Sequence, residues 1–119
     1  MEAPPVTRDV ELSKPLRSYE VVLRTGRVRY DDSGPREDPQ GRITPSLLML
    51  HDVTHDRRAL TPLANRLASL ARTVVVDLPG HGESDPIRAV RSWSQLSSWL
   101  GDLVAAIGLG RLTLLGHGF

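Results

Sequence analysis

The segment TVVVDLPGHGESD, residues 73–85, joins a short apolar run to a turn rich in glycine and proline. Three consecutive valines, at positions 74–76, are typical of a strand that is covered on both faces, because such a strand has no side that faces water. The glycines and prolines that follow predict a loop over residues 78–87. We therefore expect a buried strand at residues 73–76 that ends at a loop rich in polar groups.

Two further apolar runs lie on either side of this strand, at residues 46–50 and 112–115. A segment with helical periodicity separates each run from the central strand. The first helix is predicted to have Thr61 as its N-cap, and the second to open with a capping box at Ser92 and to end at Gly108. Strands that alternate with helices predict a parallel sheet with helices on its faces.

The N-terminal part of the chain follows a different pattern. Residues 1–17 are charged and contain three prolines, which predicts a flexible lead-in. Residues 19–24 and 27–30 alternate on either side of a Thr-Gly turn and predict a β-hairpin, and residues 31–44 predict a loop. The expected class is α/β: a hairpin, then three parallel strands, in one domain over residues 18–119.

The composition excludes several classes of protein. Apolar residues make up 39% and charged residues 24% of the chain, which is typical of a globular domain rather than a disordered or membrane protein. The net charge of +1 gives no basis for a nucleic-acid or membrane partner. The absence of cysteine excludes disulfides, thiolate metal sites and a cysteine nucleophile. No apolar leader precedes residue 19, so we expect a cytoplasmic protein.

Three motifs together resemble the α/β-hydrolase superfamily: LMLH at residues 48–51, DLPGHGESD at 77–85 and LLGHG at 114–118. The resemblance covers about residues 18–119 and rests on the order and spacing of the motifs. It implies a hydrolase-type, mostly parallel sheet flanked by helices, of which this chain carries the first five strands. It also implies a small ester, thioester or amide-like substrate, no cofactor, and a serine nucleophile on the turn after the last strand.

Two positions depart from that pattern. Gly118 lies at the nucleophile position, where it offers no hydroxyl, so no acyl-enzyme can form there. The backbone amides of Val53 and Phe119 match the two amides of the family's oxyanion hole. Asp52 replaces the glycine before the first of these amides, and its charge would repel a developing oxyanion. The family's acid and histidine follow the nucleophile in chain order, so we expect no serine-hydrolase activity from this sequence.

The histidines near these positions allow both a functional and a structural interpretation. His51, Asp52 and His117 are candidates for contact with the substrate. For His51 we favour a hydrogen-bonded structural role at the end of its strand, and for His117 a role in shaping the turn. His81 is expected to pack within its own loop.

Three functions from different classes remain open. The chain could be part of a superfamily enzyme, including a non-hydrolytic member in which His51, Asp52 or His55 supplies a general base. It could be a pseudoenzyme that binds a ligand without turnover. It could also be a half-domain, because the apolar strand at residues 112–115 suits the interior of a sheet and would need a missing C-terminal half or a second chain beside it.

Two ligand classes are less favoured. A divalent metal could use the imidazole and carboxylate groups of one loop, at His51, Asp52, His55 and Asp56. A dinucleotide could use the glycines of the turn after the last strand, but the third glycine of that fingerprint is absent. We therefore predict neither a metal site nor a bound cofactor.

Overall fold

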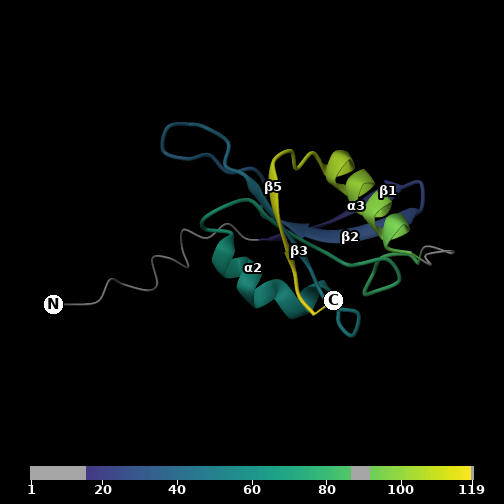
Figure 1. Ribbon diagram of the computed structural model, residues 1–119. Helices are drawn as coiled ribbons and strands as arrows, with labels where there is room; N and C mark the ends of the chain where they lie inside the picture. The colour runs from purple at the N-terminus through teal and green to yellow at the C-terminus, as the bar shows by residue number, and fades with distance from the viewer. Residues whose placement is uncertain (1–15, 87–91, 119) are drawn as a thin grey trace.

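The computed structural model describes residues 16–86 and 92–118, and within these residues it shows a five-stranded sheet with helices on both faces (Figure 1). The strands are β1 (Arg17–Leu23), β2 (Gly26–Asp32), β3 (Ser46–Leu50), β4 (Thr73–Val76) and β5 (Leu112–Gly116). The helices are α2 (Thr61–Leu67) and α3 (Trp93–Ile107), and a short 3-10 helix, η1 (Arg57–Leu60), precedes α2. The predictions for residues 1–15, 87–91 and 119 lie outside the described residues.

The strands are arranged in the order β1-β2-β4-β3-β5. The hairpin strands β1 and β2 pair antiparallel, and β2 also pairs antiparallel with β4. β3 lies between β4 and β5 and is parallel to both, so that Leu48 pairs with Val74 on one side and with Leu114 on the other. The predicted hairpin and three parallel strands are confirmed. One boundary differs, because β1 begins at Arg17, inside the predicted lead-in.

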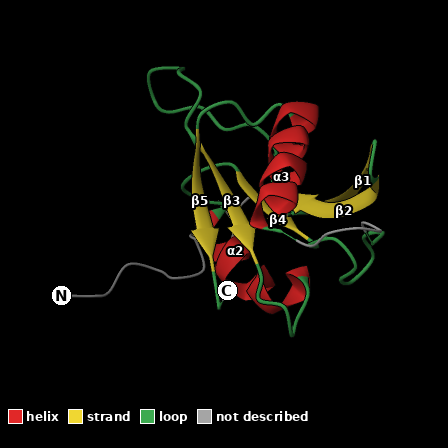
Figure 2. Cartoon of the chain, turned by 45° about the vertical axis from the view of Figure 1, so that its right-hand side comes forward, coloured by secondary structure: helices red, strands yellow, loops and turns green. Residues whose placement is uncertain are grey.

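Helices α2 and α3 lie on opposite faces of the sheet (Figure 2). A cluster of buried apolar side chains lies on each of these faces. On one face, side chains of β3 and β4 pack against α3, whose buried residues are Trp99 and Leu103. On the other face, Met49 and Val75 pack against Leu60 and Ala64. All four residues of β4 are therefore buried, as its run of valines predicts.

The ends of α3 follow the sequence signals. The Ser92 hydroxyl accepts a hydrogen bond from the Gln95 N–H at 3.3 Å, which satisfies one of the free donors of the first turn. The helix ends at Gly108, whose φ of +65° is in the left-handed region that glycine adopts without steric cost. The predicted start and end of this helix are confirmed.

The start of α2 differs from the prediction. Thr61 is the first residue of the helix rather than its cap, and Leu60 takes the cap position without a side-chain hydrogen bond. Helical structure begins before α2, in η1, where the Asp56 carboxylate accepts a hydrogen bond from the Arg58 N–H at 2.9 Å. The 3-10 helix leads directly into α2, so the capping function lies at Asp56 and the prediction for Thr61 is wrong.

In the sheet formed by the described residues, strand β5 lies at one edge and pairs with β3. Two of its leucines are partly exposed, Leu114 by 48% and Leu115 by 36%.

In the described ranges, no helix has the length and apolar character needed to cross a bilayer.

Candidate functional site

The parallel strands β3, β4 and β5 end at the same edge of the sheet, and the loops that follow them meet there. The N–H of His117, after β5, donates to the Leu50 carbonyl at 3.1 Å. The N–H of Leu78, after β4, donates to His51 Nε2 at 2.9 Å. In sheets of this kind ligands bind outside the carboxyl ends of the strands, so this edge is the candidate site.

His51 connects two of these loops and is only 1% exposed. Its Nε2 accepts from Leu78, and its Nδ1 lies 2.6 Å from the carbonyl oxygen of Asp52. Because one nitrogen accepts and the other faces an acceptor, the ring is a neutral imidazole with its proton on Nδ1. Both nitrogens are occupied by backbone partners, which is the structural arrangement favoured from the sequence.

His81 packs beside His51, with the two ring centroids 5.2 Å apart. Its Nδ1 lies 2.9 Å from the carbonyl oxygen of Pro79, in its own loop. Its Nε2 lies 3.0 Å from the carbonyl oxygen of Val53, in the loop after β3. His81 therefore packs within its loop as expected, and it also fixes the loop that carries Val53.

Asp52 and Gly118 lie in direct contact. Gly118 has a φ of +76°, and a Cβ atom built on it would lie 2.7 Å from the Asp52 Cβ and 3.1 Å from Asp52 Oδ2. Real Cβ atoms do not approach other heavy atoms at 2.7 Å. The Asp52 side chain thus occupies the space that any side chain at position 118 would need.

The two carboxylate oxygens of Asp52 have different surroundings. Oδ1 lies 2.6 Å from the Thr54 hydroxyl, 2.8 Å from the Thr54 N–H and 2.8 Å from His55 Nδ1. The Thr54 hydroxyl, followed by His55 and the Thr54 N–H, holds the pKa of Asp52 well below its usual value, so the group is ionised. Oδ2 accepts no hydrogen bond from any described residue, and His117 Nδ1 lies 3.9 Å from it.

Solved structures that resemble this chain share one fold. A bacterial membrane phospholipase A, described as a virulence factor, is 26% identical, with a TM-score of 0.72 over 94% of this chain and 34% of its own. A haloalkane dehalogenase from Agrobacterium tumefaciens is 17% identical, with a TM-score of 0.72 over 89% of this chain and 34% of its own. An E-2-(acetamidomethylene)succinate hydrolase is 22% identical, with a TM-score of 0.72 over 87% and 36%. This chain has the α/β-hydrolase fold.

The similarity of this chain to known proteins is weaker in sequence than in structure. No protein-family profile matches the chain. An uncharacterized protein of Mycobacterium tuberculosis is 29% identical over 73 residues, which is 61% of this chain and 21% of that protein. The chain spans about a fifth of the length of the curated relatives it matches, and about a third of the solved structures.

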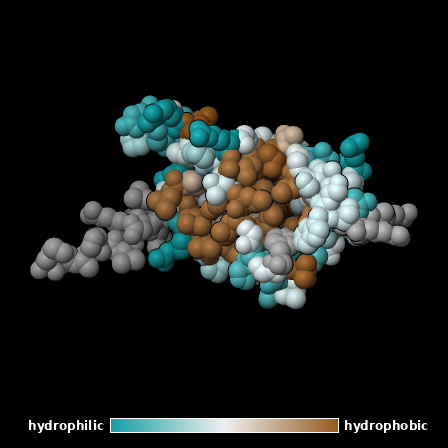
Figure 3. All heavy atoms as spheres, viewed as in Figure 1, coloured by the Kyte–Doolittle hydropathy of each residue, from teal (hydrophilic) through white to brown (hydrophobic). Residues whose placement is uncertain are grey.

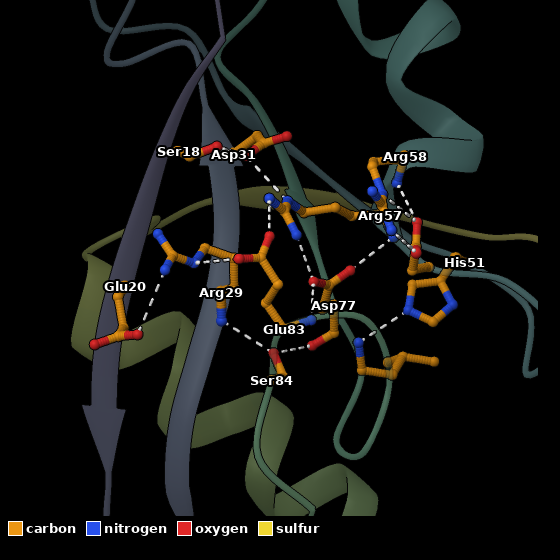
Figure 4. A network of polar contacts seen from close by, with 12 residues as sticks. Ser18, Glu20, Arg29, Asp31, His51, Arg57, Arg58, Asp77, Glu83 and Ser84 are labelled. Carbon is orange, nitrogen blue, oxygen red and sulfur yellow. Dashed lines mark hydrogen bonds and ion pairs between the residues drawn. The ribbon is translucent and has the colours of Figure 1, made fainter.

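One buried arginine, which no sequence pattern indicated, connects the elements that carry the candidate site (Figure 4). Arg57, in η1, is 7% exposed, and both its N–H and its guanidinium bind the fully buried Asp77 carboxylate at the end of β4. The guanidinium also donates to Asp31 and to Glu83, each at 3.0 Å. One side chain thus ties η1, β2 and the loop after β4 together.

The carboxylate partners of Arg57 stabilise its charged form. Burial by itself would lower its pKa, but the hydrogen bonds to Glu83 and Asp31 and the charge of Asp77 outweigh burial and raise the pKa above its usual value. Arg57 in turn lowers the pKa of Glu83. The loop after β4 is therefore held by charged hydrogen bonds, which are stronger than neutral ones.

The serine of this loop has a structural part in the α/β-hydrolase fold. The Ser84 hydroxyl donates to the Asp77 carbonyl at 2.8 Å and accepts from the Arg29 N–H at 2.9 Å. Hydrogen bonding within the loop is the role expected for it from the sequence.

In the described part of the chain, no three His, Cys, Asp or Glu side chains come together in a group that could hold a metal ion. Asp56, one of the less favoured candidate ligands, instead caps η1 and pairs with Arg58 at 2.8 Å. Phe119, whose amide was predicted to serve the oxyanion hole, lies outside the described residues.

An apolar groove of about 290 Å³ opens beside the candidate site, between α3 and the end of β3. Its lining is formed by Leu50, Leu78, Trp93, Leu96, Ser97, Trp99 and Leu100. The sequence left open whether the two tryptophans pack the helix or line a cavity. Trp99 does both, because it is buried in the core and lines the groove, whereas Trp93 is largely exposed. Figure 3 shows the broad apolar surface on this face of the molecule.

Proposed function

We propose that this chain belongs to an α/β-hydrolase-superfamily protein that binds a small ester, thioester, amide-like or related molecule at the carboxyl edge of the sheet, without a serine nucleophile. The contact between Asp52 and Gly118 carries the proposal. Gly118 supplies no hydroxyl, and Asp52 fills the space in which one would stand. The two departures from the family pattern thus fall at one point of the structure.

We assign the site residues as follows. Gly118 is the substituted nucleophile position, and the backbone amides of Val53 and Phe119 are the oxyanion donors. Asp52 and His117 contact the ligand. His51 acts through its two backbone hydrogen bonds, which position the loops around the ligand.

Binding without turnover is the second candidate function, and the Asp52 carboxylate favours it. An ionised carboxylate next to the oxyanion donors raises the energy of a transition state that carries negative charge. A pseudoenzyme would tolerate that charge, whereas an acyl-transfer enzyme would not.

A half-domain completed by a C-terminal segment or a second chain is the third candidate. The partly exposed Leu114 and Leu115 on the edge strand β5 favour it, because open apolar edges promote pairing with another strand.

Treatment with a fluorophosphonate probe tests the lack of a serine nucleophile. The full-length protein is expected to show no time-dependent labelling within residues 1–119, because Gly118 offers no hydroxyl at the nucleophile position and no serine of the described residues is hydrogen-bonded to a histidine that could activate it. A known serine hydrolase in the same reaction serves as the positive control. Stoichiometric modification of a serine here, located by peptide mass spectrometry, would contradict the proposal.

The steric conflict at position 118 predicts a coupled pair of substitutions. Gly118→Ser is expected to lower the free energy of unfolding by about 1–3 kcal/mol through overpacking, beyond the cost of a positive φ. Gly34→Ser is the matched control, since Gly34 has a φ of +82° and open space around its Cβ position.

The same substitution in an Asp52→Gly background should cost no more than the control, because the overlapping side chain is gone. Denaturant unfolding of the four variants of the cycle measures the coupling. Equal costs for Gly118→Ser in both backgrounds would show that the two side chains do not compete for space.

A further inference from the structure

One oxygen of the Asp52 carboxylate, Oδ2, accepts no hydrogen bond from the described residues. Three donors hold Oδ1, so the carboxylate is fixed in orientation, and its side chain is only 16% exposed. Oδ2 faces the turn at Gly118, and no described residue donates to it. A carboxylate oxygen that is oriented by its neighbours and left without a donor is a hydrogen-bond acceptor available to a ligand.

The charges around Oδ2 determine the kind of ligand. His117 Nδ1 is 3.9 Å away and largely exposed, and His55 contacts the other oxygen. No arginine or lysine pairs with Asp52 in the described residues. The Asp52 carboxylate is therefore an ionised group without a permanently charged partner among the described residues, and it attracts a cation and repels an anion.

The apolar groove lies at the same end of β3. Leu50 lines the groove, and Asp52 follows two residues later, after the strand has ended. Small-molecule sites commonly combine an apolar cavity with a few placed polar groups. A ligand with one cationic group and one apolar group would satisfy both features.

We infer that the site recognises a small alkylammonium-type molecule, whose cationic nitrogen binds Asp52 Oδ2 and whose apolar part enters the groove lined by Leu50, Trp99 and Leu100. This inference rests on the proposed function for the location of the site, and it goes further by naming the charge and shape of the ligand.

Three probes of equal chain length test the inference: hexylammonium, hexanoate and 1-hexanol. Binding to the full-length protein is measured by calorimetry at about pH 8, where ordinary imidazoles are uncharged. Quenching or shift of tryptophan fluorescence, compared with a Trp93→Phe variant, reports entry into the groove. Hexylammonium is expected to bind more tightly than the neutral alcohol, and hexanoate more weakly.

Asp52→Asn should weaken hexylammonium binding about tenfold or more and leave 1-hexanol unchanged, because it removes the charge and keeps the shape. Asp38→Asn is the matched control. Asp38 lies in the loop before β3, away from the carboxyl edge, and asparagine can keep the two hydrogen bonds that Oδ1 accepts from the backbone N–H groups of Gln40 and Arg42. It loses only the exposed contact between Oδ2 and the Arg42 guanidinium. This control variant should bind all three probes as the unmodified protein does.

Three results would overturn the inference: no binding of hexylammonium, equal affinity for all three probes, or tighter binding of hexanoate. A loss of hexylammonium binding in Asp38→Asn as large as in Asp52→Asn would do the same. The fluorophosphonate reaction is independent of these measurements. A failure of cation binding with no serine labelling therefore leaves the proposed function standing.

Discussion

Replacing Arg57 with alanine is expected to lower the free energy of unfolding by about 3–5 kcal/mol, because it leaves a buried carboxylate without its counter-charge. Asp77 is fully buried and receives two hydrogen bonds from Arg57. One of them comes from the guanidinium, so alanine removes the charge at the centre of the network in Figure 4. Asp31 and Glu83 would lose the same partner. Denaturant unfolding measures the loss.

The neighbouring Arg58 supplies the matched control. Its side chain is 74% exposed and pairs with Asp56 on the surface. Exposed ion pairs contribute little to stability because water screens them, so Arg58→Ala should have a small effect. If the two arginines cost the same on truncation, the buried network would not be the main support of the loop.

Gly82→Ala is expected to lower the free energy of unfolding by about 3 kcal/mol or more. A Cβ atom at this position would overlap all three carboxyl atoms of Asp77, which Arg57 prevents from moving away. The φ of +51° adds strain, because a side chain disfavours the left-handed region. Thermal and denaturant unfolding of the variant check the expectation.

Gly101→Ala is the same chemical change in a place where it should help. Gly101 lies within α3, and nothing lies within 4 Å of its Cβ position. Alanine there should add about 0.5–1 kcal/mol to the free energy of unfolding through helix propensity. The prediction for Gly82 would be wrong if Gly82→Ala left the free energy of unfolding unchanged or raised it, as Gly101→Ala should.

Most of the fold could be predicted from patterns of neighbouring residues in the sequence. The apolar runs at 46–50 and 73–76 match β3 and β4 at both ends, since a buried strand is read from its own residues. Ser92 and Gly108 mark the ends of α3 because capping is a property of a few neighbouring residues. The prediction that Thr61 caps α2 was wrong because a short 3-10 helix precedes it. Such a helix has no periodic pattern of apolar residues, so the cap at Asp56 was not recognised.

The candidate site was predicted less completely, because its contacts join distant parts of the chain. Asp52 and Gly118 both depart from the family pattern in the sequence, yet only the fold brings them together across the end of the sheet. Arg57 was missed altogether, since nothing in a polar loop distinguishes a buried arginine from a solvated one. The motif that contains Gly82 was recognised, but its steric reason depends on the Asp77 carboxylate folding back over it.

The strand order has a consequence for the protein as it leaves the ribosome. The segments that become β1 to β4 are synthesised before β5, so a four-stranded nascent sheet can close with β3 at its edge. Pairing Leu48 with Leu114 then closes a loop of more than half the chain, which makes the addition of β5 the most long-range step. Until that step, the apolar edge of β3 is open to chaperones and to other nascent chains.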